Sequence, residues 1–442
     1  MKKLNNDLRI GRSQKLYRKA KTLIPGGTML LSKRPEMFLP EYWPSYYKKA
    51  KGITVWDLDG KQYTDMTEMG IGSCVLGYAN DEVNRKVIEA VKNGSASTLN
   101  CPEEVELAEK LIELHTWAEM VRFARTGGES CAIAVRIGRA ASGRDGVAFC
   151  GYHGWHDWYL SANLADNSNL DGMLLPGLKP KGVPRGLKGT ALPFEYNRID
   201  QLEKIIKEND IGVIIMEPLR DKGPENDFLK KVRALATKNN IVLIFDEVTS
   251  GFRKVLGGIH LDLGVNPDIA VLGKALGNGY AIGAVIGKRK VMDAAQSTFI
   301  SSTFWTERIG PVAALAVLKI MKRDNVPAKI YAMGRYINSQ WEKLSNKQDL
   351  NLHIGGISSL THFDFDKDNL LKKTIITQEM LKKGYLAGNS VYVCTLHSKK
   401  VVDRYIEDLE DVMLMIKSAE KSGTLKKMLK GPVCMAKFKR LN

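Results

Sequence analysis

Short apolar runs alternate with amphipathic stretches through the middle of the chain. The runs predicted as strands are Met120–Ala124, Gly146–Phe149, Ile211–Met216, Ile241–Phe245, Asp268–Leu272 and Gly283–Gly287. The amphipathic stretches predict helices over Glu129–Ala141, Ile199–Glu208, Asp227–Lys238 and Gly310–Met321. Several strands are apolar at every position, which is typical of strands buried on both faces. The alternation therefore predicts an α/β fold, with a mostly parallel sheet covered by helices.

The two ends of the chain have a different pattern. The segment ITVWDLDGKQYTDM predicts a hairpin of Ile53–Asp57 and Gln62–Met66. The C-terminal stretch mixes helix with short strands. We expect residues 61–325 to form a large domain, and residues 1–60 and 326–442 to form a smaller α+β domain.

Composition and charge narrow the class of protein. With 442 residues, 44% of them hydrophobic and 26% charged, the chain is typical of a globular protein. It has no apolar run near ~20 residues, and its basic N-terminus has no apolar core of an export signal. Six cysteines without CxxC pairs indicate reduced thiols, so we expect a cytoplasmic protein. The net charge of +17 is spread along the chain, which favours a lysine-rich surface over nucleic-acid binding, and without a long apolar run we expect no membrane partner.

Charged residues follow three of the predicted strands, where open parallel sheets bind their ligands. Lys274 comes after DIAVLG, and a lysine desolvated there has the lowered pKa that a Schiff base requires. Asp246 comes after IVLIF and is suited to hold a proton on a buried ring nitrogen. Glu217 comes after IGVIIM. The alternatives are a solvated lysine after a turn and carboxylates that cap helices or form structural ion pairs.

Two further loops follow strands. Gly127 and Gly128 open a predicted helix, where exposed N–H groups form an anion site unless the loop is a plain glycine-rich turn. It lacks both the dinucleotide fingerprint and the P-loop pattern. The loop CGYHGWHDW offers an aromatic lid for a flat ring. The pair His153 and His156 lacks further metal ligands at known spacing, so we expect no metal.

Together these features meet the needs of pyridoxal 5′-phosphate: phosphate binding, ring stacking, a charged pyridinium and a covalent anchor. From Ile24 to Leu318 the chain resembles the class III pyridoxal-phosphate aminotransferases of fold type I, within them most closely the glutamate-1-semialdehyde aminomutase branch. The stretches that carry the resemblance are IPGGT, ITVWDLDGKQYTDM, TGGESCAIAVRIGRAASGRD, GYHGWHD, IMEP, IFDEVTSGFR, PDIAVLGKALGNGYAIGAV and SSTF. It implies a large domain with a seven-stranded sheet and a smaller domain built from both termini.

The resemblance also implies roles for residues that contact the cofactor ring. Lys274 would form the Schiff base and shuttle protons, and Asp246 would pair with the pyridinium nitrogen. Val248 would pack on the ring face opposite Tyr152, with His153 beside them in the GYHGWHD stretch.

Other implied roles concern the phosphate and the second subunit. Gly127 and Gly128 would offer backbone N–H groups to the phosphate. Thr303 would reach the phosphate of the neighbouring subunit in a homodimer, and Glu217 would support the site.

The substrate segments depart from the aminomutase branch. IPGG is followed by TMLLSKRPEMF instead of a segment close to VNSPVRAF, and STFWTER replaces GTLSGNP. The substrate-binding serine is therefore absent, and the arginine is displaced to Arg34 or replaced by Lys33. Arg34 and Arg308 are candidates for binding a substrate carboxylate or phosphate.

These features favour an aminotransferase that moves an amino group from an amino-acid donor, with glutamate expected, to an aldehyde or ketone acceptor. Chains of this kind resemble enzymes of sugar, surface-polysaccharide or specialised metabolism. The alternative within the fold is glutamate-1-semialdehyde 2,1-aminomutase, an intramolecular transfer. Retention of both Lys274 and Asp246 argues against a non-catalytic binding protein on this scaffold.

Overall fold

The structure is a computed structural model that describes residues 8–173 and 176–436. The chain divides into two compact units, and the first comprises the residues before 81 together with those after 328. We call this part unit 1 and the continuous stretch from 81 to 328 unit 2. The N-terminal part of unit 1 runs past residue 60, the boundary expected from the sequence, because strand β3 (Gln62–Met66) belongs to its sheet.

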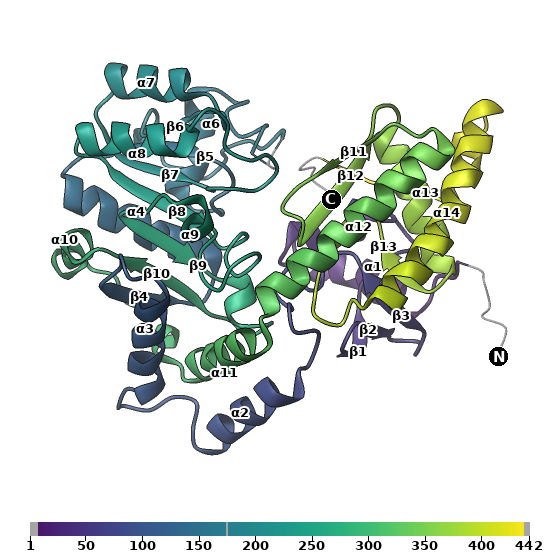
Figure 1. Cartoon of the computed structure of the whole chain (residues 1–442), viewed down its shortest axis with the longest axis horizontal. Helices are drawn as coiled ribbons and strands as arrows, with labels where there is room; N and C mark the ends of the chain where they lie inside the picture. Colours follow the sequence, from purple (N-terminus) through teal and green to yellow (C-terminus); the bar gives the residue numbers. More distant parts are fainter. Residues whose placement is uncertain (1–7, 174–175, 437–442) are drawn as a thin grey trace. The chain divides into compact units, whose positions relative to one another are not determined.

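Unit 2 contains strands that alternate with helices along the chain (Figure 1). Its strands are β4 (Met120–Ala124), β5 (Gly146–Cys150), β6 (Ala191–Pro193), β7 (Ile211–Met216), β8 (Val242–Glu247), β9 (Ile269–Leu272) and β10 (Gly283–Gly287). Its longer helices are α2 (Asp81–Lys92), α3 (Pro102–Leu114), α4 (Gly127–Ser142), α7 (Ile199–Glu208), α8 (Phe228–Lys238) and α11 (Ile309–Asp324). Its short helices are α5 (Asp157–Leu160), α6 (Ala162–Ala165), α9 (His260–Leu263) and α10 (Arg289–Met292).

Within the described residues, these strands form a seven-stranded sheet in the order β4-β10-β9-β8-β7-β5-β6. The pairs from β9 through β6 are parallel, whereas β10 is antiparallel to both β9 and β4. The predicted mostly parallel sheet is therefore confirmed. Strand β8 lies between β7 and β9, so the carboxyl ends of these three strands meet at one edge of the sheet.

Both faces of this sheet are covered, as the continuous apolar strands predict. Along β7, Val213 and Ile215 pack into a core that includes Ile133 of α4. The alternate residues Ile214 and Met216 pack into a second core formed with α7 and α8. Because successive side chains of a strand point to opposite faces, the two cores lie on opposite sides of the sheet.

Unit 1 is built from both ends of the chain. Its helices are α1 (Arg12–Leu23), α13 (Asn369–Lys382), α14 (Lys399–Lys421) and all but the first three residues of α12 (Val326–Gln348). Its strands are β1 (Tyr47–Lys51), β2 (Thr54–Asp57), β3, β11 (Leu352–Gly355), β12 (Leu360–Phe365), β13 (Tyr385–Ala387) and β14 (Ser390–Tyr392). The predicted hairpin is confirmed as β2 and β3, and β13 adds to it as a parallel neighbour.

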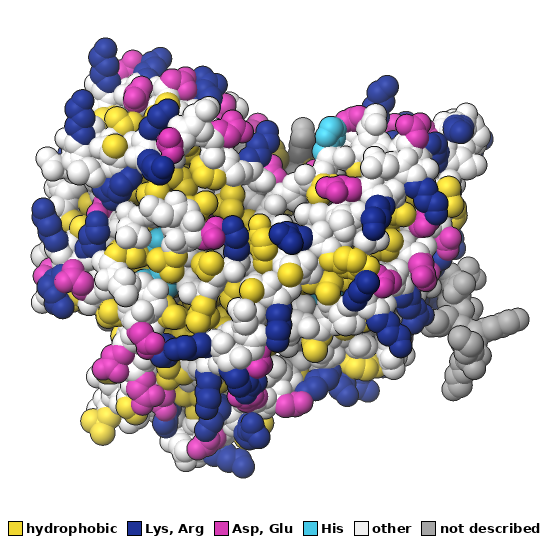
Figure 2. Space-filling view, in the orientation of Figure 1, with side chains coloured by type: hydrophobic (Ala, Val, Ile, Leu, Met, Phe, Trp, Pro, Cys, Tyr) yellow, Lys and Arg dark blue, Asp and Glu magenta, His cyan; other side chains and the backbone are white. Residues whose placement is uncertain are grey.

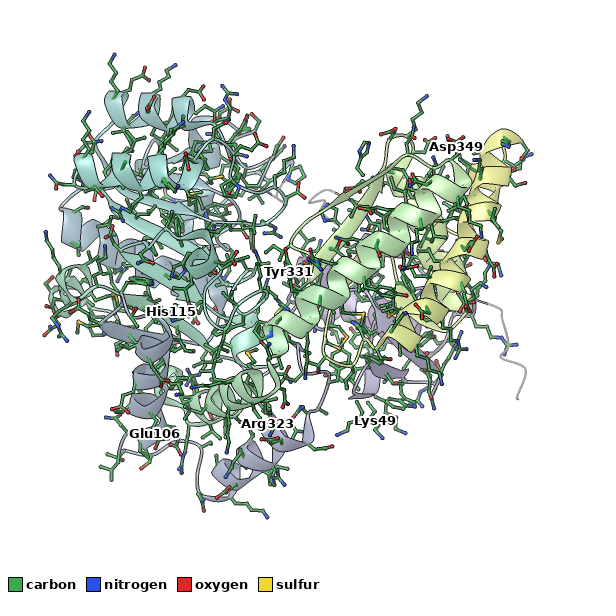
Figure 3. All side chains as sticks on the ribbon, in the orientation of Figure 1. Lys49, Glu106, His115, Arg323, Tyr331 and Asp349 are labelled. Atoms are coloured by element: carbon green, nitrogen blue, oxygen red, sulfur yellow. The ribbon has the colours of Figure 1, made fainter. Side chains whose placement is uncertain are left out.

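The surface carries charges of both signs. Lys and Arg side chains are scattered among Asp and Glu over the face shown in Figure 2. Arg323 near the end of α11 (labelled in Figure 3), for example, pairs with Glu82 of α2 at 2.9 Å. Among the described residues, no helix combines the length and the apolar character needed to cross a bilayer.

Candidate active site

Three charged residues meet at the carboxyl edge of the sheet. Asp246 lies near the carboxyl end of β8, where it pairs with Val271 of β9. Glu217 follows the end of β7 directly, and Lys274 lies two residues beyond β9. Adjacent parallel strands therefore bring together residues that are far apart in the sequence, as their positions after the strands predict.

Lys274 is held in a strained and desolvated position. Its φ of 41° lies in the left-handed region that side-chain-bearing residues rarely adopt, as is common at functional sites. Its Nζ donates a hydrogen bond to Thr249 Oγ1 at 2.9 Å. Burial lowers the pKa of the amine to about 8, and the nearby positive charge of Arg220 adds to this effect.

This low pKa predicts an unusual pH profile for the Lys274 amine. Since only the neutral amine is a nucleophile, its reaction with a small aldehyde should rise with pH and level off above about 8. About one amine in ten is then neutral at pH 7, against about one in 2,500 for an ordinary lysine. Reductive alkylation across pH 6–11, read by mass spectrometry of the Lys274 peptide, measures this. A rise that continues to pH 10 would contradict the prediction.

Asp246 is buried and surrounded by hydrogen-bond donors. Its Oδ2 pairs with His153 Nδ1 at 2.8 Å and accepts from the Cys131 thiol at 3.2 Å. Its Oδ1 accepts from the Val248 N–H at 3.1 Å. Burial alone raises the pKa of a carboxyl, but the hydrogen bond and charge of His153 outweigh it, so the pKa of Asp246 lies below its ordinary value. Asp246 therefore stays a carboxylate where it can hold a proton on a cationic ring nitrogen.

The cluster of Cys131, His153 and Asp246 has the residue types of a metal site, with ligand atoms within 4.8 Å of one another. Metal binding requires the thiolate. Burial and the neighbouring Asp246 charge raise the pKa of the Cys131 thiol well above its ordinary value. The protonated thiol thus serves Asp246 as a hydrogen-bond donor.

Glu217 forms a second charged group at the same edge. Its Oε2 accepts a hydrogen bond from the Tyr152 N–H at 3.2 Å. Its two oxygens pair with Arg220 Nη1 at 2.9 and 3.1 Å. Glu217 thereby joins the aromatic loop to the turn after β7, and Tyr152 remains partly exposed beside them.

Helix α4 begins at the same edge with a well-formed cap. Thr126 Oγ1 accepts from the Glu129 N–H, and the Glu129 carboxylate accepts from the Thr126 N–H at 2.9 Å. The next residues are the predicted Gly127 and Gly128, whose N–H groups have no acceptor within the helix. A Cβ at Gly127 would lie 3.0 Å from the side chain of Val248. This close approach favours glycine and places Val248 directly beside the candidate anion site.

A buried network fixes the segment that follows Asp246. Glu247 accepts from the Ile259 N–H, from the His260 N–H at 3.0 Å and from the His260 ring. His260 Nε2 in turn accepts from Trp117. His115 (labelled in Figure 3) stacks on His260 and accepts from the Gly258 N–H at 2.8 Å. Because Glu247 adjoins Asp246, this network holds the carboxyl end of β8 in place.

Arg34, Arg308 and Thr303 were also predicted to belong to the site, and the structure gives each of them the following neighbours. Arg34 lies in unit 1 against Gly26, where an added Cβ would lie 2.1 Å from its guanidinium. Arg308 pairs with Glu103, with Nη2 2.6 Å from Oε1. Thr303 is exposed at the start of a short 3₁₀ turn, Thr303–Thr306. The roles predicted for these three residues stay predictions.

Three residues of the site were not singled out by the sequence patterns. Thr249 directly follows Val248, so its place after β8 was a usable signal. Cys131 lies on the sheet-facing side of α4, where an apolar role is the usual expectation. Arg220 lies in an irregular turn, which hydrophobic periodicity does not describe.

The chain is similar to proteins of one family over most of its length. The family model for class III aminotransferases matches residues 40–414. The chain is 32% identical to 3-aminobutyryl-CoA aminotransferase of Cloacimonas acidaminovorans, over 93% of this chain and 98% of the relative. It is also 32% identical to glutamate-1-semialdehyde 2,1-aminomutase of Methanothrix thermoacetophila, over 90% and 96% of the two chains.

Solved structures agree in fold. The FumI protein of Sphingopyxis sp. MTA144, in a form with pyridoxal phosphate (PLP), superposes with a TM-score of 0.83 at 23% identity, covering 93% of this chain and 98% of that one. A transaminase with PLP bound gives a TM-score of 0.82 at 22% identity, covering 94% and 100%.

Proposed function

The chain belongs to the class III aminotransferase family and is a PLP-dependent enzyme, and from this premise we propose that it transfers an amino group from an amino-acid donor to an aldehyde or ketone acceptor. Glutamate is the proposed donor. The observation that carries the proposal is the desolvated Lys274 amine, which lies at the same sheet edge as the buried carboxylate of Asp246.

The residues present fit the cofactor. Lys274 supplies an amine of lowered pKa for covalent attachment. Asp246, kept ionised by His153, matches a protonated ring nitrogen. The start of α4 supplies N–H groups and the positive end of a helix dipole for a phosphate. Tyr152 and Val248 are proposed to face the two sides of the ring.

When bound, PLP supplies an electron sink that lets the Cα proton of an amino substrate leave. Lys274 Nζ would take that proton and pass it to the cofactor carbon, and the same transfer would run in reverse on the acceptor. Thr249 orients the amine through its hydrogen bond. Asp246 would hold a proton on the ring nitrogen, and its contacts with His153 and Cys131 keep the carboxylate in position.

We further propose a homodimer, in which Thr303 reaches the phosphate of the second subunit. Large apolar side chains near Thr303 support this, because Phe299 is 84% exposed and Phe304 is 70% exposed. A groove of about 590 Å³ lies beside them, lined in part by Phe299 and Trp305. Exposed aromatic side chains of this size are typical of surfaces that a partner covers.

The experiment that tests the function is the visible absorbance of the purified holoenzyme during donor addition. L-glutamate should bleach the band of the lysine-linked cofactor and release one equivalent of 2-oxoglutarate. The 32% identity to glutamate-1-semialdehyde 2,1-aminomutase favours a second candidate, intramolecular transfer. That enzyme would convert glutamate-1-semialdehyde without a separate donor and without release of a keto acid. A protein that cannot be loaded with PLP would contradict both.

A further inference from the structure

Beyond α14 the chain returns to the N-terminal part of unit 1. After the 3₁₀ turn Leu425–Met428, residues 429–435 form an irregular segment, which we call the strap. It passes close to Pro40, because a Cβ at Gly431 would lie 3.3 Å from the Pro40 carbonyl oxygen. The strap and the residues before 40 lie outside the stretch that the class III family model matches, so family membership assigns them no role.

Two buried polar side chains of α13 hold the strap by its backbone. Gln378 accepts a hydrogen bond from the Lys430 N–H at 2.8 Å, and its amide donates to the carbonyl of Met428 at 2.8 Å. Thr374 Oγ1 accepts from the Cys434 N–H at 3.0 Å. Both side chains are fully buried, and buried polar groups require such partners. This polar face of α13 is therefore a seat for the strap.

The far end of the strap reaches the N-terminal segment. The Met435 N–H donates to the carbonyl oxygen of Glu36 at 2.7 Å, within the 3₁₀ turn Pro35–Met37. The carboxylate of Glu36 in turn accepts from the Tyr17 hydroxyl of α1 at 2.9 Å. This turn begins directly after Arg34, one of the candidate substrate-binding residues. The strap therefore connects α13 with the turn and, through Glu36, with α1.

The strap buries little apolar surface. Its side chains Lys430, Pro432 and Val433 are exposed, whereas Cys434 is buried. A groove of about 270 Å³ is lined in part by the strap and by α1, so the two are not closely packed there. Segments with few buried apolar contacts open locally while the rest of the domain stays folded. The polar seat on α13 can also be hydrated when the strap lifts, which lowers the cost of opening.

We propose that the strap is a reversible latch on the N-terminal segment of unit 1. When closed, it shields Cys434 and holds the turn Pro35–Met37 through Glu36. When open, it releases this turn while the remainder of unit 1 stays folded. The latch thus acts on the stretch TMLLSKRPEMF, in which the chain departs from the aminomutase branch. The inference goes beyond the proposed amino transfer and does not depend on it.

The thiol of Cys434 reports the state of the latch, because a buried thiol reacts only when it becomes accessible. The holoenzyme is treated with N-ethylmaleimide, and the labelled peptides are quantified over time by mass spectrometry. Cys434 should be labelled at least about 100-fold faster than Cys394, which is buried in the same unit and becomes accessible when that unit unfolds. Equally slow labelling of the two thiols would overturn the latch.

A matched pair of variants tests the seat on α13. Thr374→Val removes the acceptor of the Cys434 N–H and keeps the shape of the side chain, so labelling of Cys434 should become about fivefold faster, the usual effect of one hydrogen bond. The control is Thr377→Val. Thr377 is equally buried, and its hydroxyl donates to the carbonyl of Lys373 as that of Thr374 donates to Leu370. It should leave the labelling of Cys434 unchanged.

A second variant acts on the other contact of the seat. Gln378→Met removes two hydrogen bonds to the strap and its preceding turn, so labelling of Cys434 should become about 25-fold faster. An equal increase in Thr374→Val and Thr377→Val, or no increase in Thr374→Val and Gln378→Met, would overturn the latch.

Hydrogen exchange tests the far end of the strap. In Thr374→Val and Gln378→Met, the backbone amides of residues 35–43 should exchange at least about twofold faster than in the wild-type holoenzyme, because the turn loses its contact whenever the strap opens. In Thr377→Val their exchange should be unchanged. Faster labelling of Cys434 without faster exchange over residues 35–43 would overturn the inference, since the strap would then open without holding the N-terminal segment.

Discussion

Replacement of Lys274 by alanine is expected to lower the rate of amino transfer by about 10⁴-fold, the upper end of what a general acid–base group contributes. Two effects combine in this residue. Its amine, with a pKa of about 8, is the proposed covalent anchor, and it is also the only base that we assign to the Cα proton. The measurement is the stopped-flow rate of donor bleaching, together with intact mass after borohydride reduction.

The Lys274→Ala protein should still bind PLP, because the carboxylate of Asp246 and the start of α4 are unchanged. Borohydride should then fix no cofactor to the chain. The control is Lys288→Ala. Lys288 follows the end of β10 and pairs with Asp268, and its loss should leave the cofactor attached. Covalent cofactor retained on the Lys274→Ala chain would show that another lysine is the anchor.

Replacement of Asp246 by asparagine should lower the transfer rate by about 10²–10³-fold, the usual effect of removing one preorganised charge from a reacting centre. Asparagine has nearly the same shape, so the change is mainly electrostatic. The amide cannot stabilise a protonated ring nitrogen, and His153 loses the carboxylate 2.8 Å away. The loss should appear in the bleaching rate and as a shift of the cofactor absorbance band.

The effect of pH on Asp246 has a definite sign. Because the pKa of Asp246 in the folded protein is below its ordinary value, the carboxylate stays ionised through and above the pH range in which an ordinary aspartate titrates. Wild-type activity should therefore show no acid limb from this group between about pH 5 and 8. The control is Asp200→Asn, which changes an exposed aspartate and should leave the pH profile unchanged. A wild-type band that changes as Asp246 titrates in that range would contradict this assignment.

The hydrophobic pattern predicted the sheet well where strands are wholly apolar. The bounds of β7 and β10 match the expected Ile211–Met216 and Gly283–Gly287. Strand β8 differs, because it extends through Asp246 and Glu247, which pair with β9 although they are charged. Buried partners satisfy both carboxylates, and a sequence pattern does not show such partners. Helix α4 begins at Gly127 rather than Glu129, and the capping pair of Thr126 and Glu129 was a readable signal.

The sequence predicted those residues of the candidate site that lie at the ends of strands. Glu217 and Lys274 follow strands, Asp246 lies near the end of β8, and the sheet order brings the three together. The partners of these residues come from other elements: Cys131 from a helix and Arg220 from a turn. Their contacts depend on how the elements pack together, and the periodicity of hydrophobic residues does not predict such packing. The resemblance to class III aminotransferases did not reveal Arg220, because none of its motif stretches covers this turn.

The composition of unit 1 from both chain ends has a consequence for synthesis on the ribosome. Strand β3 ends at Met66, and its neighbour β13 begins at Tyr385, so roughly 320 residues must be added before the pair can form. At about 5–20 residues per second this takes roughly 15 to 60 s. Unit 2 is continuous and can fold during that interval. During this time the edge of β3 that later pairs with β13 stays unpaired. An unpaired edge is prone to aggregation, so we expect chaperones to bind the nascent chain.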